Sequence, residues 1–301
     1  LAMDGKAIST HAGRRRKTDR PGAPDGRRDT DADVGRKSFR GARRDGTMWE
    51  KVSEWFGYKL HLIVDADYEL PVAFEVTRAS SSELKQGKAM IKRLVERHEK
   101  LLEGCETLTA DRGYDDGKLI KELWDEHGVK PVIAIRDMWK DGEETKLVEG
   151  RRNIVYNYKG EVFCHCPATA ERRPLPYGGF EKERATLKYR CPASHYGLEC
   201  AGKKRCPVRG AVRIPLGEER RIFTPLARSS YAWERAYGKR GAVERVNSRL
   251  DVSFGFERHF IRGLKKMRLR CGLALMVMLA MAVGRIKEKR KEMMRSLVKA
   301  A

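Results

Sequence analysis

The spacing of hydrophobic residues over the first 136 positions changes between a strand period and a helix period. Apolar residues alternate or run continuously over short segments, as in strands, and recur at helical intervals over two longer segments. In chain order, the patterns predict strands over 1–10, 57–67 and 70–77, a helix over 84–102, a strand over 106–110, a helix over 115–127 and a strand over 131–135. Strands followed by alternating helices and strands predict a mixed sheet flanked by helices, an α/β architecture.

The pattern is interrupted over residues 137–224, which carry short β-prone runs and five of the seven cysteines. Helical spacing returns near Tyr231 and continues, with breaks near Gly255 and Gly263, into an apolar segment and a charged tail. We therefore predict a core that is divided in the sequence. Its first part is 1–136, a β-rich insertion that contains cysteines occupies 137–224, and C-terminal helices over 225–301 complete the core and end in a basic tail.

Residues 11–46 follow neither period and are rich in Arg, Asp, Gly and Pro. Such a composition offers too little apolar surface to order a chain, so we predict a flexible basic arm. The run of four cations at 14–17 would allow the arm to follow a phosphate backbone after ordering on DNA. A solvated linker explains the same composition, and the sequence leaves both interpretations open.

The net charge narrows the range of partners. The chain has 64 Lys and Arg against 42 Asp and Glu, a formal charge of +22. This excess is larger than solubility requires and predicts attraction to phosphates, so we infer that the substrate is DNA. A basic soluble protein without such a partner is the alternative.

Three acidic residues stand in local contexts that make sense if folding brings them together. Asp4 lies in the first predicted strand, Asp111 directly follows the strand over 106–110, and Glu244 lies on a predicted late helix. Three converging carboxylates make an oxygen site suited to Mg²⁺ or Mn²⁺. A buried Asp in an apolar strand is costly without such a partner.

Two of the three acids also have a simpler explanation, whereas Asp4 is harder to explain away. Asp111 precedes Arg-Gly and could serve only a turn, while Glu244 could be a solvated helix residue paired with Arg240. Asp65 and Asp67, at the end of the second predicted strand, compete for a catalytic place. We interpret these two as acids of the hairpin turn.

Local motifs in a fixed order carry a resemblance to a known family. They are Met3-Asp4-Gly5-Lys6, Asp31-Ala32-Asp33 with Gly35, Trp55-Phe56-Gly57-Tyr58-Lys59, Ala110-Asp111-Arg112-Gly113-Tyr114 and Arg240-Gly241-Ala242-Val243-Glu244-Arg245-Val246-Asn247. With these motifs, nearly the whole chain resembles a bacterial insertion-sequence transposase of the DDE superfamily. The resemblance is to the group with a β-rich insertion between the second Asp and the Glu.

The late helix carries the most specific of these motifs. The group has a Tyr, an Arg three residues later, a Glu four residues after that and a Lys after seven more. Tyr237, Arg240 and Glu244 match, whereas position 251 is Asp. On one helix these spacings share a face, so Arg240 can hold Glu244 ionised and oriented. Nearby cations, Arg245, Arg249 or Lys239, would then replace the missing Lys.

The resemblance implies a ribonuclease-H-like catalytic core and a reaction. The implied activity is DNA cleavage and strand transfer at the ends of an insertion sequence, by phosphoryl transfer with two Mg²⁺ or Mn²⁺ ions. By resemblance, Asp4 would bridge both ions, and Asp111 and Glu244 would each help to hold one. A hydrolytic nuclease of the same fold, and a degenerate DNA-binding remnant without activity, are the alternatives.

The expected partners and location follow from the same resemblance. Double-stranded DNA, as transposon ends and target, would be bound with the help of six residues: Tyr237, Arg240, Arg245, Arg249, Lys265 and Lys266. We expect a homo-oligomer on DNA, in the bacterial cytoplasm at the nucleoid. The longest apolar run, 271–283, is shorter than the roughly 20 residues that span a bilayer, so we predict a buried helix and no membrane partner.

The cysteines of the insertion allow a structural zinc site. Our tetrahedral set is Cys166, Cys191, Cys200 and Cys206. Their spacing lacks the paired C-x-x-C pattern, and we favour reduced structural thiols over the zinc site. The seven cysteines, an odd number, make a disulfide framework a poor explanation.

Overall fold

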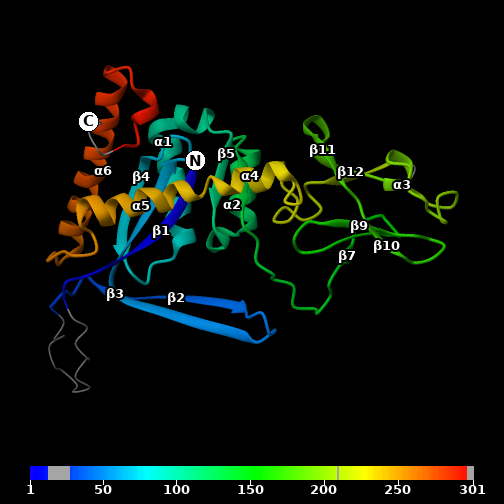
Figure 1. The fold of residues 1–301 in the computed structure, drawn as a ribbon, viewed down its shortest axis with the longest axis horizontal. Coiled ribbons are helices and arrows are strands. Elements are labelled where there is room, and N and C mark those ends of the chain that lie inside the picture. Colours follow the sequence, from blue (N-terminus) through cyan, green and yellow to red (C-terminus); the bar gives the residue numbers. More distant parts are fainter. Residues whose placement is uncertain (13–27, 209, 297–301) are drawn as a thin grey trace. The chain divides into compact units, whose positions relative to one another are not determined.

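The computed structural model describes residues 1–12, 28–208 and 210–296 (Figure 1). The chain forms two compact units, of which the first combines Leu1–His98 with Arg240–Ala301 and the second is Glu99–Lys239. Helices accompany antiparallel strands in the first unit and a parallel pair in the second, which confirms a mixed α/β protein. The predicted division into core, insertion and C-terminal helices stays a prediction.

The first unit is built around one long strand. The 18-residue strand β3 (Met48–Asp65) pairs over its second half with β1 (Ala2–Ser9) and with β4 (Leu70–Arg78), both antiparallel. The predicted hairpin of the second and third strands is therefore confirmed. At its turn, Asp65 Oδ1 accepts hydrogen bonds from the backbone N–H groups of Asp67 and Tyr68, at 2.9 and 2.8 Å, so Asp65 acts in the turn as expected.

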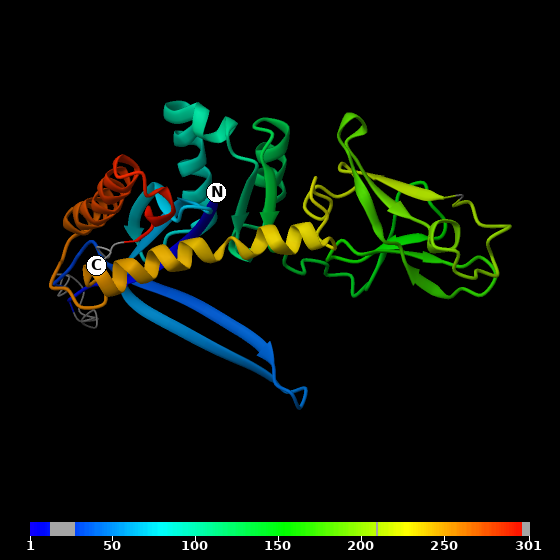
Figure 2. The same ribbon diagram turned by 45° about the horizontal axis from the view of Figure 1, so that its top comes forward.

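Part of the predicted flexible arm is an ordered strand. β2 (Asp33–Ala42) pairs antiparallel with the first half of β3 and makes a hairpin that extends away from its unit (Figures 1 and 2). The prediction of an arm over 11–46 is wrong for this segment, while 13–27 lies outside the described residues. The segment is ordered because the Asp45-Gly46 turn reverses the chain and pairs β2 with β3. In this turn Gly46 adopts a φ of 84°, and Asp45 accepts a hydrogen bond from the Thr47 N–H at 2.9 Å.

Three helices complete the first unit. α1 (Glu83–Glu103) begins in it and is kinked at His98, where φ is −147°. α5 (Gly241–Phe254) ends at Gly255, whose left-handed φ of 64° suits glycine, and α6 (Leu264–Lys287) follows Gly263. A short 3₁₀ turn, Lys291–Met293, lies after α6. The predicted breaks near both glycines are confirmed.

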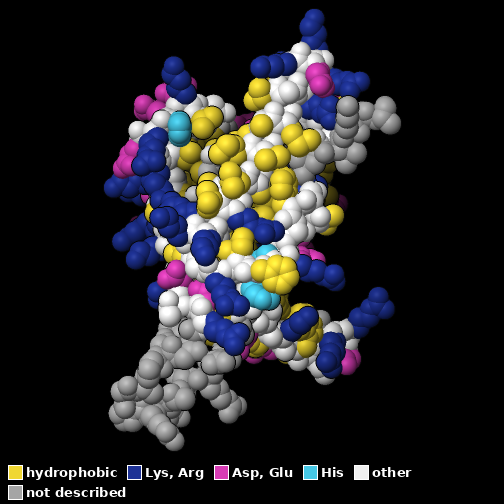
Figure 3. Space-filling view, turned by 90° about the vertical axis from the view of Figure 1, so that its left-hand side faces the viewer, with side chains coloured by type: hydrophobic (Ala, Val, Ile, Leu, Met, Phe, Trp, Pro, Cys, Tyr) yellow, Lys and Arg dark blue, Asp and Glu magenta, His cyan; other side chains and the backbone are white. Residues whose placement is uncertain are grey.

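Helix α6 is buried on one face only. Its Met267, Cys271, Leu275 and Met278 belong to the core that contains α5 and the strands. Its other face exposes apolar side chains, which form a hydrophobic area bordered by Lys and Arg in Figure 3. α6 is long and apolar enough to cross a membrane, with a mean hydropathy of 1.8, but a soluble core helix meets the same criterion.

The second unit begins with the parallel pair. β5 (Thr107–Ala110) and β6 (Lys130–Ile133) are joined through a 3₁₀ turn, Arg112–Tyr114, and α2 (Gly117–Asp125). Asp116 caps α2 by accepting from the Leu119 N–H at 2.8 Å. These elements match the predicted strand, helix and strand. α4 (Tyr231–Gly238) closes the unit.

The rest of the second unit is rich in short strands, as predicted. One sheet of four strands contains β7 (Lys146–Leu147), β8 (Ile154–Tyr156), β9 (Val162–His165) and β10 (Arg172–Pro174). A sheet of three strands contains β11 (Tyr177–Glu181), β12 (Thr186–Arg190) and β13 (Ala211–Pro215), with the turns Lys182–Arg184 and α3 (Pro192–His195) nearby in the chain. Residues of both sheets share one hydrophobic cluster.

Candidate active site

Asp4 lies in the middle of β1 and is half-buried. Its Oδ1 accepts the Gly5 N–H at 2.7 Å, and its Oδ2 accepts from Nη1 of Arg240 at 3.3 Å. Both contacts favour the ionised carboxylate. The predicted first acid is therefore held by a backbone N–H and an arginine inside the first unit.

A second carboxylate beside Asp4 comes from Glu83, the first residue of α1. The side chain of Glu83 is only 14% exposed, and its Oε1 lies 3.4 Å from the Nζ atoms of Lys37 and Lys59. A Cβ at Gly5 would lie 2.8 Å from this oxygen, so a larger residue there would displace the Glu83 carboxylate. Oε1 is buried without a hydrogen-bond partner.

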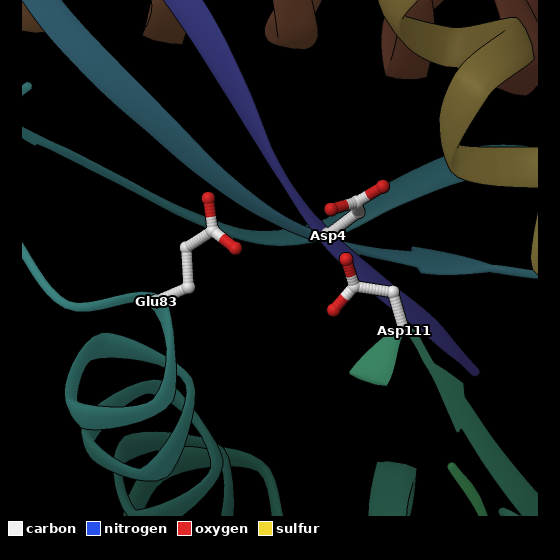
Figure 4. Close-up of side chains that lie close together, drawn as sticks. All are labelled: Asp4, Glu83 and Asp111. Carbon is white, nitrogen blue, oxygen red and sulfur yellow. The ribbon is translucent and has the colours of Figure 1, made fainter. Parts of the chain in front are cut away.

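Asp4 and Glu83 together offer two carboxylate ligands for a divalent metal ion. Their nearest carboxylate oxygens lie within 4.8 Å of each other, a separation that one divalent ion can bridge (Figure 4). The buried oxygen of Glu83, which lacks a hydrogen bond, fits a metal ligand. Lys37 and Lys59 lie beside the Glu83 carboxylate and Arg240 beside that of Asp4, so cations balance both negative charges.

Sequence reasoning missed Glu83. Glu83 directly precedes the predicted helix over 84–102, and α1 begins at Glu83, where an acid is ordinarily explained by the start of the helix. The local sequence around Glu83 does not distinguish an acid at a helix start from a metal ligand, because the difference depends on where α1 begins relative to β1. A three-dimensional structure is needed to see it.

Glu244 is linked to Asp4 through one arginine. Arg240 donates from Nη2 to Glu244 Oε1 at 2.6 Å and from Nη1 to Asp4 Oδ2 at 3.3 Å, which confirms the predicted pair on the helix. The Glu244 side chain is 57% exposed. Within the described residues, the acidic group that could hold a metal includes Asp4 and Glu83, but not Glu244.

Asp111 follows β5 in the second unit and is also labelled in Figure 4. Its Oδ1 accepts the Gly113 N–H at 2.7 Å and caps the 3₁₀ turn, as the simpler explanation required. This bond uses one of the two carboxylate oxygens. A catalytic role for Asp111 is compatible with it and stays a prediction.

The predicted single helical face is divided between two helices. Tyr237 belongs to α4, which ends before Lys239, and Glu244 to α5. Within α4, the ring of Tyr237 stacks on that of Trp233 with centroids 4.9 Å apart. Tyr237 and Glu244 therefore do not lie on one continuous helix as expected.

The position where the family has Lys is paired with a cation from another element. Asp251 of α5 accepts from Lys6 Nζ of β1 at 2.5 Å. The helix therefore carries an anion, Asp251, where the family has a cation, and the nearby cation, Lys6, lies on the strand. Lys6 is two residues from Asp4, so a cation is still present beside the candidate site.

The predicted DNA-binding arginines of α5 have a carboxylate partner. Arg245 Nε and Arg249 Nη2 each lie 2.6 Å from an oxygen of Glu69, and Arg295 lies at 3.3 Å. Glu69 is only 6% exposed, so these contacts fix α5 to the turn between β3 and β4. Lys265 and Lys266 are exposed at the start of α6. The DNA contacts of all four residues stay predictions.

The cysteines are all free thiols. In the part of the chain that the structure describes, Cys166, Cys191, Cys200 and Cys206 do not come together as a group that could hold a metal ion. The side chain of Thr169 and nearby backbone N–H groups lower the pKa of Cys166 to about 6, whereas burial raises that of Cys164 to about 11. The structural zinc site therefore stays a prediction, with reduced thiols as its alternative.

Comparison with protein-family models matches residues 1–280 to the transposase DDE domain. The chain belongs to this family. It is therefore a transposase of the DDE type, and membership implies an enzyme that cleaves or transfers DNA, binds DNA and uses divalent metal ions. The acidic group around Asp4 is compatible with such a metal site. Comparisons with curated proteins and with solved structures gave no match.

Proposed function

We propose that this transposase cleaves DNA at the ends of an insertion sequence and joins them to a target by metal-dependent phosphoryl transfer. The observation that carries the proposal is the close pair of half-buried carboxylates, Asp4 and Glu83, in a chain whose family uses divalent metals. A charge of +22 supports a DNA substrate. We expect it to act as a homo-oligomer on DNA in the bacterial cytoplasm.

We further propose that the catalytic core is ribonuclease-H-like, as the family resemblance implies. In such a core, Asp111 would be a further metal ligand, a role that rests on the family resemblance alone. The third carboxylate is Glu244 by family resemblance and Glu83 by proximity to Asp4. Both residues support catalysis, Glu83 as a ligand and Glu244 by orienting Arg240 against Asp4.

The residues of the site have separate tasks in this proposal. Mg²⁺ or Mn²⁺, when bound, would activate the attacking oxygen and stabilise the leaving one. Asp4, Asp111 and Glu83 would hold the ions. Arg240 pairs with both Asp4 and Glu244, and Lys37 and Lys59 lie against Glu83, where they would attract the phosphate backbone.

The decisive test compares four variants on one labelled duplex that carries an element end. We expect Asp4→Asn, Asp111→Asn and Glu83→Gln to lower Mg²⁺-dependent cleavage at least about a hundredfold, because each removes a charged ligand. Glu257→Gln, an exposed acid of the same unit, is the control and should cleave normally. DNA affinity, measured by fluorescence anisotropy, should stay within about threefold in all four.

Glu244→Gln separates the two candidates for the third ligand. If Glu244 is a ligand, its loss equals that of Glu83→Gln and weakens Mn²⁺ binding, measured by electron paramagnetic resonance. If it only orients Arg240, cleavage falls while Mn²⁺ binding stays. Normal cleavage in Asp4→Asn and Asp111→Asn would contradict the proposal as a whole.

Two alternatives have distinct products. A hydrolytic nuclease would cut the duplex without joining its 3′ end to a target plasmid. A remnant without activity, suggested by Asp251 in place of the expected Lys, would bind DNA and yield no cut strand. The joined product, detected on a gel, is expected only from the transposase.

A further inference from the structure

The hairpin of β2 and β3 has two chemically different faces. Residues that stand opposite each other in an antiparallel pair share a face, and the faces alternate along each strand. By the register, odd-numbered residues lie on one side, which we call the odd face: Gly35, Lys37, Phe39, Gly41, Trp49, Lys51, Ser53 and Trp55. We call the opposite side, with Arg36, Met48, Glu50, Val52 and Glu54, the even face.

The odd face presents flat aromatic rings. Trp55 lies across Gly35 and Trp49 across Gly41, where a Cβ would meet the Trp49 ring at 2.8 Å. Two glycines therefore allow two indole rings to lie on the partner strand. Trp49 and its neighbour Phe39 are nevertheless exposed, so these rings are not part of the core.

From Gly35 to Gly41 and from Trp49 to Trp55, the charged residues of the odd face are all basic. Lys37 and Lys51 alternate there with the aromatic residues, and no Asp or Glu lies on it between Gly35 and Gly41 or between Trp49 and Trp55. Both acids of this stretch, Glu50 and Glu54, are on the even face, where Glu54 stands opposite Arg36. Within these two stretches, the acids are thus separated from the rings and lysines. Asp33, at the start of β2, also lies on the odd face, where its carboxylate accepts hydrogen bonds from Ser80.

The odd face leads to the candidate active site. Lys37 Nζ lies 3.4 Å from Glu83 Oε1 and donates to the carbonyl oxygen of Gly5 at 3.2 Å. Lys59, the other cation on Glu83, lies over the Trp55 ring at 5.7 Å from its centroid. A ligand on the odd face would therefore run directly to Glu83 and to Asp4 beside it.

We infer that the odd face is a docking surface for duplex DNA that guides the strand to Asp4 and Glu83. The inference rests on the proposed function, because it takes DNA as the substrate. A two-stranded ribbon fits the major groove, and ten residues of β2 span about 34 Å, close to one turn of duplex. The lysines would contact phosphates and the rings would pack on sugars or base edges.

The test compares changes of equal charge on the two faces. Lys51→Ala and Arg36→Ala each remove one exposed cation, from the odd and the even face respectively. Binding to a 30-base-pair duplex is measured by anisotropy from 50 to 200 mM KCl. We expect Lys51→Ala to weaken binding and to reduce the slope of log affinity against log salt by about 1, and Arg36→Ala to leave both nearly unchanged.

A second pair tests the rings. Trp49→Ala should weaken binding at least about fivefold, whereas Met48→Ala, on the even face of the same strand, should not. Trp49→Phe should restore most of the affinity if stacking matters. Circular dichroism shows whether each variant keeps its fold.

Equal effects of Lys51→Ala and Arg36→Ala, together with a neutral Trp49→Ala, would overturn the inference and leave the proposed function intact. Failure of the wild-type chain to bind any duplex would instead contradict the proposed function. The two failures are distinguishable because the first requires normal wild-type binding.

Discussion

At the scale of single residues, His61 shows how burial near the candidate site fixes a protonation state. The ring lies on β3 with Nε2 2.9 Å from Thr77 Oγ1. Burial, and then the charge of Lys59, lower its pKa to about 4. His61 is therefore neutral at pH 7 and adds no positive charge beside Glu83.

This pKa predicts a loss of stability in acid. An unfolded histidine has a pKa near 6.5, so as the pH falls below that value the unfolded chain binds the proton first. The contribution of His61 to the free energy of unfolding is complete above about pH 6.5 and is lost as the pH falls towards 4. Between pH 7 and 4.5, we expect the wild type to lose about 2 kcal/mol more unfolding free energy than His61→Gln, measured by urea titration. Equal losses would show that His61 does not titrate with a low pKa.

The sequence could identify some residues of the site and not others. Asp4 and Asp111 could be proposed because each stands in or after a predicted strand within a recognisable motif. The pairing of Arg240 with Glu244 was found because it is local, four residues apart on one helix. Glu83 and Lys6 were not, because their partners lie far away in the sequence and no local pattern encodes such contacts.

At the scale of elements, one buried carboxylate fixes α5 to the sheet. Glu69 has a left-handed φ of 55° and accepts from three arginines, two of them on α5. Burial lowers the pKa of Arg249, but Glu69 opposes that effect. Loss of Glu69 would leave Arg249 partly buried without its carboxylate.

We therefore expect Glu69→Gln to lower the free energy of unfolding by about 2 kcal/mol, because it breaks a mostly buried ion pair. The control is Glu96→Gln, which removes an exposed i,i+4 partner of Lys92 and should cost less than about 0.5 kcal/mol. Thermal or urea unfolding measures both. A similar small effect for the two would mean that Glu69 does not anchor α5.

The elements that were predicted are those with a buried face. β1, β4, α1 and α2 place apolar side chains at strand or helix spacing, and each was found. The hairpin of β2 was missed because its described side chains are largely exposed beyond Gly35, so hydrophobic alternation is absent. The break between α4 and α5 was missed because both helices share one apparent period across residues 239 and 240.

At the scale of the whole molecule, the exposed face of α6 remains without a partner in the described chain. Its apolar side chains, which are 41 to 64% exposed, include Leu269, Leu273, Met276, Val277, Leu279 and Val283. Together they expose on the order of 500 Å², the upper part of the range for the largest patch of a monomer. Covering this patch on two copies would bury about 1,000 Å², near the lower limit for a specific interface.

We expect self-association through α6, with a salt dependence opposite to that of DNA binding. Lys265, Arg268 and Lys287 border the patch near its two ends, so two copies repel each other until salt screens the charges. Sedimentation at 0.1 and 0.5 M KCl should show more dimer at the higher salt concentration. Leu273→Glu should give a monomer at both, because it places a charge in the centre of the patch. Leu101→Glu, at an exposed leucine of α1, should leave the dimer intact, and a monomeric wild type at every concentration would contradict the prediction.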